Sequence, residues 1–307
     1  MTLRFVFHKE AEYMANWSDL LDEINETRPL DSVRRKYLAE LSQYTNRNTI
    51  AYYSAFLERQ VSNVDINDSD MNGFMNAVCG LDRTKGLDLI LHTPGGDPAA
   101  AESIISYLRT VFHNDIRVIV PHMAMSAGTL MACASQRIIM GNHSFLGPVD
   151  PQLAGIPAFN IVDEFNEARN DLATNPTNAM FWKLRLEKYP ATFVKTAADA
   201  ISLSDTLLDT WLRTGMFSEQ TPENEAIIER IKRSLNEHSN SKVHNRHFSK
   251  EECCGFGLKI TALEDDPTLQ DKVLSVHHAY THTITMATVA KLIENHEGKA
   301  LISHIKQ

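Results

Sequence analysis

The sequence predicts a mixed α/β fold, a parallel β-sheet with helices on its flanks, and two segments carry this prediction. In the first, the short apolar run Leu87–Leu91 ends at the turn Thr93–Gly96, whose sequence is Thr-Pro-Gly-Gly. Residues 97–98, Asp-Pro, then open a helix with an apolar face. This order of strand, glycine turn and helix is typical of one unit of a parallel α/β sheet.

The second segment repeats the alternation. Residues Ile116–Val120 and Arg137–Met140 are short and rich in β-branched side chains, so we expect two strands. The small residues of 126–134 between them suit a buried helix. Strands that alternate with helices pair in parallel through right-handed crossovers.

The part of the chain before this core is predicted to begin with helices. Apolar residues recur at helical spacing in 1–48, which we expect to form an N-terminal helical region. A first strand is expected at Thr49–Leu57 and a helix at Met71–Leu81.

The part after the core is predicted to be mainly helical. A helical insertion is expected over about 158–237, and the polar run His238–Lys242 is expected to be a loop. Ser249 starts a capped helix, Leu258–Ile260 is expected to be a short strand, and a final helix is expected over Leu269–Asn295. Residues 49–307 would then form one domain, to which the N-terminal region and the insertion are added.

Composition excludes several classes of protein. Hydrophobic residues make up 43% of the 307 and charged residues 22%, as in globular proteins. The net charge of −9 makes nucleic acid an unexpected partner. No apolar run reaches the ~18 residues of a membrane span, no signal peptide is visible, and the four cysteines lack disulfide or metal spacing. We therefore expect a soluble, cytoplasmic protein without a metal or other cofactor.

The residues best suited to chemistry are a serine and a glycine turn. Ser126, in Met-Ser-Ala-Gly, follows the Ile116–Val120 strand and begins a helix. Backbone N–H groups at such a position favour a developing negative charge. The Pro-Gly-Gly turn ends the neighbouring strand, so the two strand ends would face each other.

This segment resembles the superfold shared by Clp proteases and crotonases, in which a parallel sheet forms a spiral. The resemblance implies a nucleophilic Ser126 and an oxyanion hole formed by the N–H groups of Gly96 and Ala127. It also implies a peptide or protein substrate and a homo-oligomer.

The run Gly-Pro-Val-Asp-Pro-Gln at 147–152 resembles one particular family within this superfold. A Clp protease has a histidine near this place, whereas this chain has Asp150. The run is similar to that of the serine dehydrogenase proteinase family, relatives of signal peptide peptidase A whose triad has the chain order Ser, Asp, His. A triad is defined by its geometry, so the order is no obstacle. The resemblance implies that Asp150 orients a histidine further along the chain.

The histidine has several candidates. His247 lies just before a short helix and a Gly-Leu-Lys-Ile strand, a context that resembles these relatives, so it is our first choice. His278 and His244 are the alternatives. His278 and His282 also have the i, i+4 spacing of a zinc pair, but Ala279 stands where the hydrolase motif needs Glu, so no metal is expected.

Two other interpretations remain open. A Ser-Lys dyad could use Lys183, Lys188 or Lys195, although these lie in helix-like sequence that would face solvent. A crotonase-like acyl enzyme, or a noncatalytic protein of the same fold that binds a partner, could use the same backbone. Our main prediction is a serine endopeptidase, in which Ser126 is the nucleophile.

Overall fold

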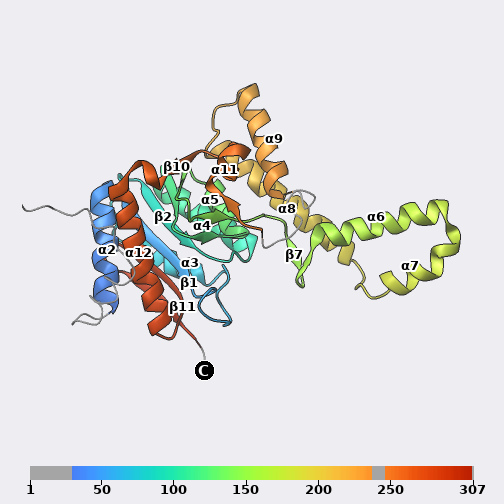
Figure 1. The fold of residues 1–307 in the computed structure, drawn as a ribbon, viewed down its shortest axis with the longest axis horizontal. Coiled ribbons are helices and arrows are strands. Elements are labelled where there is room, and N and C mark those ends of the chain that lie inside the picture. The colour runs from blue at the N-terminus through green and yellow to red at the C-terminus, as the bar shows by residue number, and fades with distance from the viewer. Residues whose placement is uncertain (1–29, 237–245, 306–307) are drawn as a thin grey trace, which may run out of the picture.

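A seven-stranded sheet forms the centre of the computed structural model, which describes residues 30–236 and 246–305 (Figure 1). Its order is β10-β5-β3-β2-β1-β11-β12. Five strands are parallel: β1 (Asn48–Ser54), β2 (Leu87–His92), β3 (Ile116–Val120), β5 (Arg137–Met140) and β10 (Ile260–Ala262). The strands β11 (Val289–Asn295) and β12 (Ala300–His304) extend the sheet in antiparallel fashion. The protein is therefore a mixed α/β protein with a mostly parallel sheet, as predicted.

Alternate side chains of the central strands enter two separate cores. In β2, Leu87, Leu89 and Leu91 pack with α3 (Asp70–Val78), α4 (Pro98–Phe112) and α5 (Ala127–Cys133). Ile90 points to the other face, where α2 (Leu30–Thr45) and α12 (Pro267–Met286) lie side by side (Figure 1). The sheet is thus the middle layer of three, and burial on both faces explains why the central strands β2, β3 and β5 are mostly apolar.

Two smaller sheets stand beside the main one. One has the order β4-β6-β9, formed by Met123–Ala124, Phe145–Leu146 and Phe248–Ser249. The other pairs β7 (Gln152–Leu153) with β8 (Ile156–Pro157). Their strands lie close in sequence to the predicted catalytic residues: β4 comes just before Ser126, β7 just after Asp150, and β9 just after His247.

The predicted insertion is helical, and part of it projects from the body as an arm (Figure 1). The arm comprises α6 (Ala158–Thr174), a short 3-10 turn, α7 (Ala179–Leu186) and the first part of α8 (Phe193–Thr214). The rest of α8 returns to the main core and is followed by α9 (Pro222–Asn236).

Helix caps explain several of the predicted boundaries. Asp97 caps α4, since its carboxylate accepts a hydrogen bond of 2.9 Å from the Ala99 N–H. Ser249 caps α11 (Lys250–Phe256) in a capping box with Glu252, and Gly257 ends that helix at a positive φ of 109°. These boundaries agree with the prediction from sequence.

The C-terminal prediction was partly wrong. The expected helix over Leu269–Asn295 ends at Met286, because β11 pairs with β1 and β12 as a strand of the sheet. The expected strand Leu258–Ile260 is displaced to Ile260–Ala262. Residues 1–29 of the N-terminal region and the loop His238–Lys242 lie outside the described residues. Among the helices that the structure does describe, none is long and apolar enough to cross a membrane.

Candidate active site

Ser126 lies in a strained turn between β4 and α5. Its backbone has φ 51° and ψ −116°, a conformation that costs a non-glycine residue about 1–3 kcal/mol. The turn is held against the end of β2, because the Thr93 N–H donates to the Met123 carbonyl and the Met125 N–H donates to the Thr93 carbonyl, both at 3.0 Å. Such strain at an exposed strand-to-helix turn is typical of a nucleophilic serine.

The Pro-Gly-Gly turn packs directly on this serine. Gly95 has φ 98°, and a Cβ added there would lie 2.6 Å from the Met125 carbonyl oxygen and 2.7 Å from the Ser126 Cβ. A Cβ on Gly96 would lie 2.4 Å from the backbone N and O of Ile66. Only glycine at 95 allows the Pro-Gly-Gly turn to come this close to the Ser126 turn, and only glycine at 96 allows it to come this close to Ile66.

Two backbone N–H groups at this contact have no acceptor within the described ranges. The neighbouring amides are occupied, since Gly95 donates to Thr93 Oγ1 at 3.2 Å and Gly128 donates to the Met125 carbonyl at 2.8 Å. By contrast, the N–H groups of Gly96 and Ala127 donate to no other residue in the described parts of the chain. Both residues line the same cavity as Ser126, which is the arrangement an oxyanion hole requires.

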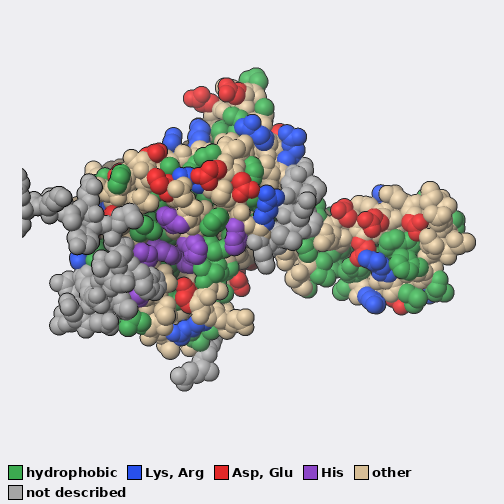
Figure 2. Space-filling view, viewed as in Figure 1, with side chains coloured by type: hydrophobic (Ala, Val, Ile, Leu, Met, Phe, Trp, Pro, Cys, Tyr) green, Lys and Arg blue, Asp and Glu red, His purple; other side chains and the backbone are tan. Residues whose placement is uncertain are grey.

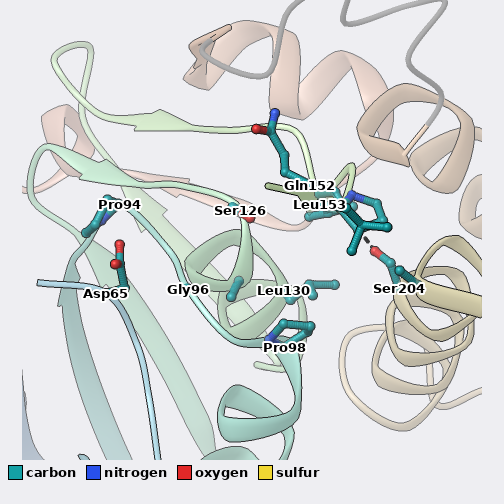
Figure 3. A pocket seen from close by; sticks show the side chains of 13 residues that line it. Asp65, Pro94, Gly96, Pro98, Ser126, Leu130, Gln152, Leu153 and Ser204 are labelled. Atoms are coloured by element: carbon teal, nitrogen blue, oxygen red, sulfur yellow. Dashed lines mark hydrogen bonds between the residues drawn. The ribbon is translucent and has the colours of Figure 1, made fainter. Parts of the chain in front are cut away.

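The cavity beside Ser126 has a volume of about 360 Å³ (Figure 3). Its apolar wall comes from α4, α5, α8 and the segment around β7, and Asp65 is the only charged residue among the described residues that line it. Ser204 of α8 also lines the cavity, but its hydroxyl donates to the Val149 carbonyl at 2.8 Å. The cavity can therefore hold an apolar side chain next to the serine.

Asp150 is fully buried and adjoins the cavity without lining it. Its neighbours Val149 and Pro151 both line the cavity. Val149 is held by a 2.9 Å hydrogen bond from its N–H to the Leu235 carbonyl of α9. The Gly-Pro-Val-Asp-Pro run thus connects the serine cavity to the helices of the insertion.

His247 is exposed and lies in the segment next to the serine turn. The following residue, Phe248, pairs with Leu146, and Leu146 pairs with Ala124, two positions before Ser126. The His247 ring packs on Phe145 at a centroid distance of 5.6 Å and is not part of the cavity wall. The small sheet therefore brings together two segments that are far apart in the sequence, although the imidazole itself stands outside the cavity.

A cluster of other histidines lies at the same end of the sheet. His92 ends β2 and His122 follows β3, and their rings lie 5.6 Å apart and 5.3 and 5.8 Å, respectively, from the ring of His277 on α12. The alternative base His278 joins the cluster at 5.8 Å from His277. Figure 2 shows histidine side chains gathered on the body of the molecule, away from the arm.

Burial favours the neutral form of His92 and His277. It lowers the pKa of His92 to about 3, with a further contribution from His122, and it lowers the pKa of His277 well below the ordinary value. The sequence motifs did not point to His92 and His122. The signal was their position, since each stands at the carboxyl end of a parallel strand whose next residues build the serine site.

The other candidates for the catalytic base do not lie at the serine cavity in the described residues. His244 falls outside the described residues. Lys183, Lys188 and Lys195 are exposed on the arm and line no part of the serine cavity. Within 30–236 and 246–305, no group of three or more His, Cys, Asp or Glu side chains is placed to hold a metal ion.

The sequence is similar to one protein family and to two curated proteins. Residues 30–180 match the family described as ClpP-like SDH-type serine proteinase. An uncharacterized protein of Methanocaldococcus jannaschii is 39% identical over 158 residues, which are 48% of this chain and 53% of that protein. A second uncharacterized protein of this organism is 44% identical over 79 residues, 26% of this chain and 27% of that protein. The chain thus matches about half of the first relative's length and about a quarter of the second's.

Proposed function

Because residues 30–180 belong to the ClpP-like SDH-type serine proteinase family, we propose that this protein is a serine endopeptidase that hydrolyses peptide bonds at Ser126. The family resemblance extends the proposal to the fold, a Clp protease and crotonase-like superfold in which residues 49–307 act as one catalytic domain. It likewise extends to a homo-oligomer, while a cytoplasmic location remains an expectation from the sequence.

In the proposed reaction, Ser126 Oγ attacks the carbonyl carbon of the scissile peptide bond. His247 accepts the hydroxyl proton and later donates it to the leaving amine, and Asp150 holds the imidazole in the correct tautomer. Water then attacks the acyl-enzyme, again with His247 as the base, and releases Ser126. The base must come within about 3 Å of the serine oxygen, a contact that often tightens only when substrate is bound.

The observation that carries the proposal is that two residues lining the serine cavity, Gly96 and Ala127, have N–H groups without an acceptor in the described ranges. The oxygen of the tetrahedral intermediate becomes negatively charged, and the N–H groups of Gly96 and Ala127 are the donors available to it. A donor of this kind lowers the barrier by about 3 kcal/mol. The strained backbone of Ser126 supports the same role, since a serine that served only packing would have no need of it.

The test is hydrolysis of an unfolded protein, such as casein, by the full chain. Ser126→Ala should reduce the rate at least about a thousandfold while leaving the thermal midpoint nearly unchanged, because the nucleophile is lost and little packing changes. The control is Ser135→Ala, a buried serine in the turn after α5. Equal hydrolysis by the wild type and by Ser126→Ala would overturn the proposal.

A further inference from the structure

We infer that the serine cavity selects peptides that place a basic residue on the Asp65 side of Ser126 and an apolar residue on the other side. This inference rests on the proposed peptidase function and adds the substrate class. Figure 3 shows its geometric basis, with Ser126 lying between Asp65 and the group formed by Leu153 and Ser204.

Asp65 supplies a fixed negative charge to one end of the cavity. Asp65 is exposed, and its carboxylate forms no ion pair with any residue in the described ranges. The nearby cation, Lys291, donates to the Asp65 carbonyl at 2.7 Å, but its charge is matched by Asp70, whose Oδ1 lies 2.7 Å away. The Asp65 charge is therefore left for a ligand.

The backbone around Asp65 is tied to the oxyanion turn. The Ile66 N–H donates to the Gly95 carbonyl at 2.7 Å, and the Asp97 N–H donates to the Ile66 carbonyl at 2.9 Å. These two bonds hold residue 65 in register with Gly96. The backbone of Asp65 is consequently held beside the turn that would bind the scissile carbonyl, and its carboxylate lines the same cavity as Ser126.

The opposite end of the cavity is mainly apolar, although Gln152 and Ser204 also line it. It is walled by Pro98 of α4, Leu130 of α5, Leu153 of β7 and Ala200 of α8. An apolar side chain buried there gains about 25 cal/mol for each Å² removed from water, whereas a charged one would lose its hydration without a partner. This end therefore favours an aliphatic or aromatic residue.

A bound peptide must meet both ends. Its scissile carbon has to lie at Ser126 Oγ and its carbonyl oxygen at the N–H groups of Gly96 and Ala127, so the chain crosses Ser126. Side chains on the two sides then meet the carboxylate and the apolar wall, respectively. Acidic residues on the Asp65 side are repelled by the like charge.

The experiment is cleavage-site profiling by mass spectrometry with a mixed peptide library and the full chain. The wild type should enrich Lys and Arg on one side of the scissile bond and apolar residues on the other. Asp65→Asn should reduce the preference for Lys over Glu at the basic position about tenfold, and Asp65→Lys should reverse it. Asp68→Asn, an exposed acid in the same loop that does not line the cavity, should keep the wild-type profile.

The outcomes separate this inference from the proposed function. If Ser126-dependent cleavage occurs without a basic preference, or if Asp65→Asn keeps that preference, the inference is overturned and the peptidase stands. If the wild type cleaves no peptide in the library and does not hydrolyse casein either, the peptidase proposal itself fails.

Discussion

At the scale of single residues, the site depends on how closely two backbone turns approach each other. Gly95 brings the end of β2 against the turn at Ser126, and Gly96 brings it against the backbone of Ile66, so that a Cβ at either position would clash. Gly96 and Ala127 line the same cavity, and their N–H groups have no acceptor in the described parts of the chain. In the proposed reaction, the oxyanion is stabilised by backbone N–H groups, whose positions follow from short sequence motifs.

A substitution at Gly95 tests this contact. Gly95→Ala should lower the hydrolysis rate at least about tenfold and destabilise the protein by about 1–3 kcal/mol, since the new Cβ would press on Met125 and Ser126 at a positive φ. Gly155→Ala is the matched control: φ is also positive, at 78°, but no atom of the described residues lies within 4 Å of the added Cβ. Equal loss of activity in both variants would show that the close approach is unimportant.

A second prediction concerns the base. His247→Ala should reduce hydrolysis at least about a hundredfold, because the general base that takes the Ser126 proton is lost, whereas His278→Ala should stay within a fewfold of wild type. Initial rates on casein measure both. An active His247→Ala beside an inactive His278→Ala would move the base to α12 and leave the nucleophile unchanged.

The sequence predicted some of these residues and missed others for a physical reason. Ser126, Gly96 and Ala127 belong to short motifs whose geometry is set by neighbouring residues. Asp65, which lines the cavity, reaches it only because Ile66 bridges to Gly96, a contact between chain segments that no local pattern encodes.

At the scale of elements, α2, α12 and β11 are joined by a buried charge. The Arg34 guanidinium donates to Glu294 Oε2 at 2.5 Å, both side chains are fully buried, and the Tyr280 hydroxyl donates to the same carboxylate at 2.9 Å. Arg35 reaches Glu294 from a partly exposed position, with its Nε 2.8 Å from Oε1. Two arginines of one helix thus bind one carboxylate from different environments.

Because Arg34 is buried and Arg35 is partly exposed, we expect their substitutions to lower the free energy of unfolding by different amounts. Arg34→Met should lower the free energy of unfolding by about 3–5 kcal/mol, because it leaves the Glu294 charge buried with too few partners. Arg35→Met should cost no more than about 1 kcal/mol, since solvent screens the partly exposed Arg35 guanidinium and Arg34 and Tyr280 still bind Glu294. Urea denaturation of the two variants measures both, and similar midpoints would contradict this interpretation of the cluster.

The histidine cluster predicts a pH-dependent stability. The pKa of His92 is about 3 in the folded protein, whereas a histidine in the unfolded chain keeps its ordinary value of 6.5, so the unfolded state binds more protons between these values. The free energy of unfolding should therefore be highest above pH 6.5 and fall as the pH drops toward 3. Thermal midpoints measured across this range check the slope.

Two variants test whether His92 causes this pH dependence: His92→Phe removes the group, and His304→Gln is the control. His92→Phe should flatten the decline, because Tyr53 and Phe56 already surround the site with aromatic rings and a phenyl group does not titrate. His304→Gln, at an exposed position of β12, should keep the wild-type slope. An unchanged slope in His92→Phe would rule out His92 as the source.

Secondary structure was predictable where local signals agree. The caps of α4 and α11 and the apolar strands β2, β3 and β5 are encoded locally and were confirmed. The final helix was extended too far because β11 contains Lys291, Glu294 and Asn295, polar residues that alone suggest a surface helix. Their burial is stabilised only by distant partners such as Asp70 and Arg34.

At the scale of the whole molecule, the arm is the feature that departs most from a compact α/β body (Figure 1). Its helix α7 exposes Met180, Phe181 and Leu184. The family resemblance predicts a homo-oligomer, so light scattering coupled to size-exclusion chromatography should give a multiple of 34.6 kDa. A single species at 34.6 kDa across micromolar concentrations would contradict this prediction.

The central claim is that Ser126 is a nucleophile activated within the folded chain. Its most direct test is mass spectrometry of the full protein after reaction with a fluorophosphonate, followed by peptide mapping. We expect one adduct per chain, on Ser126, which persists in Ser204→Ala and is absent in Ser126→Ala and in heat-unfolded protein. An adduct on Ser204, or no adduct on the folded wild type, would contradict it.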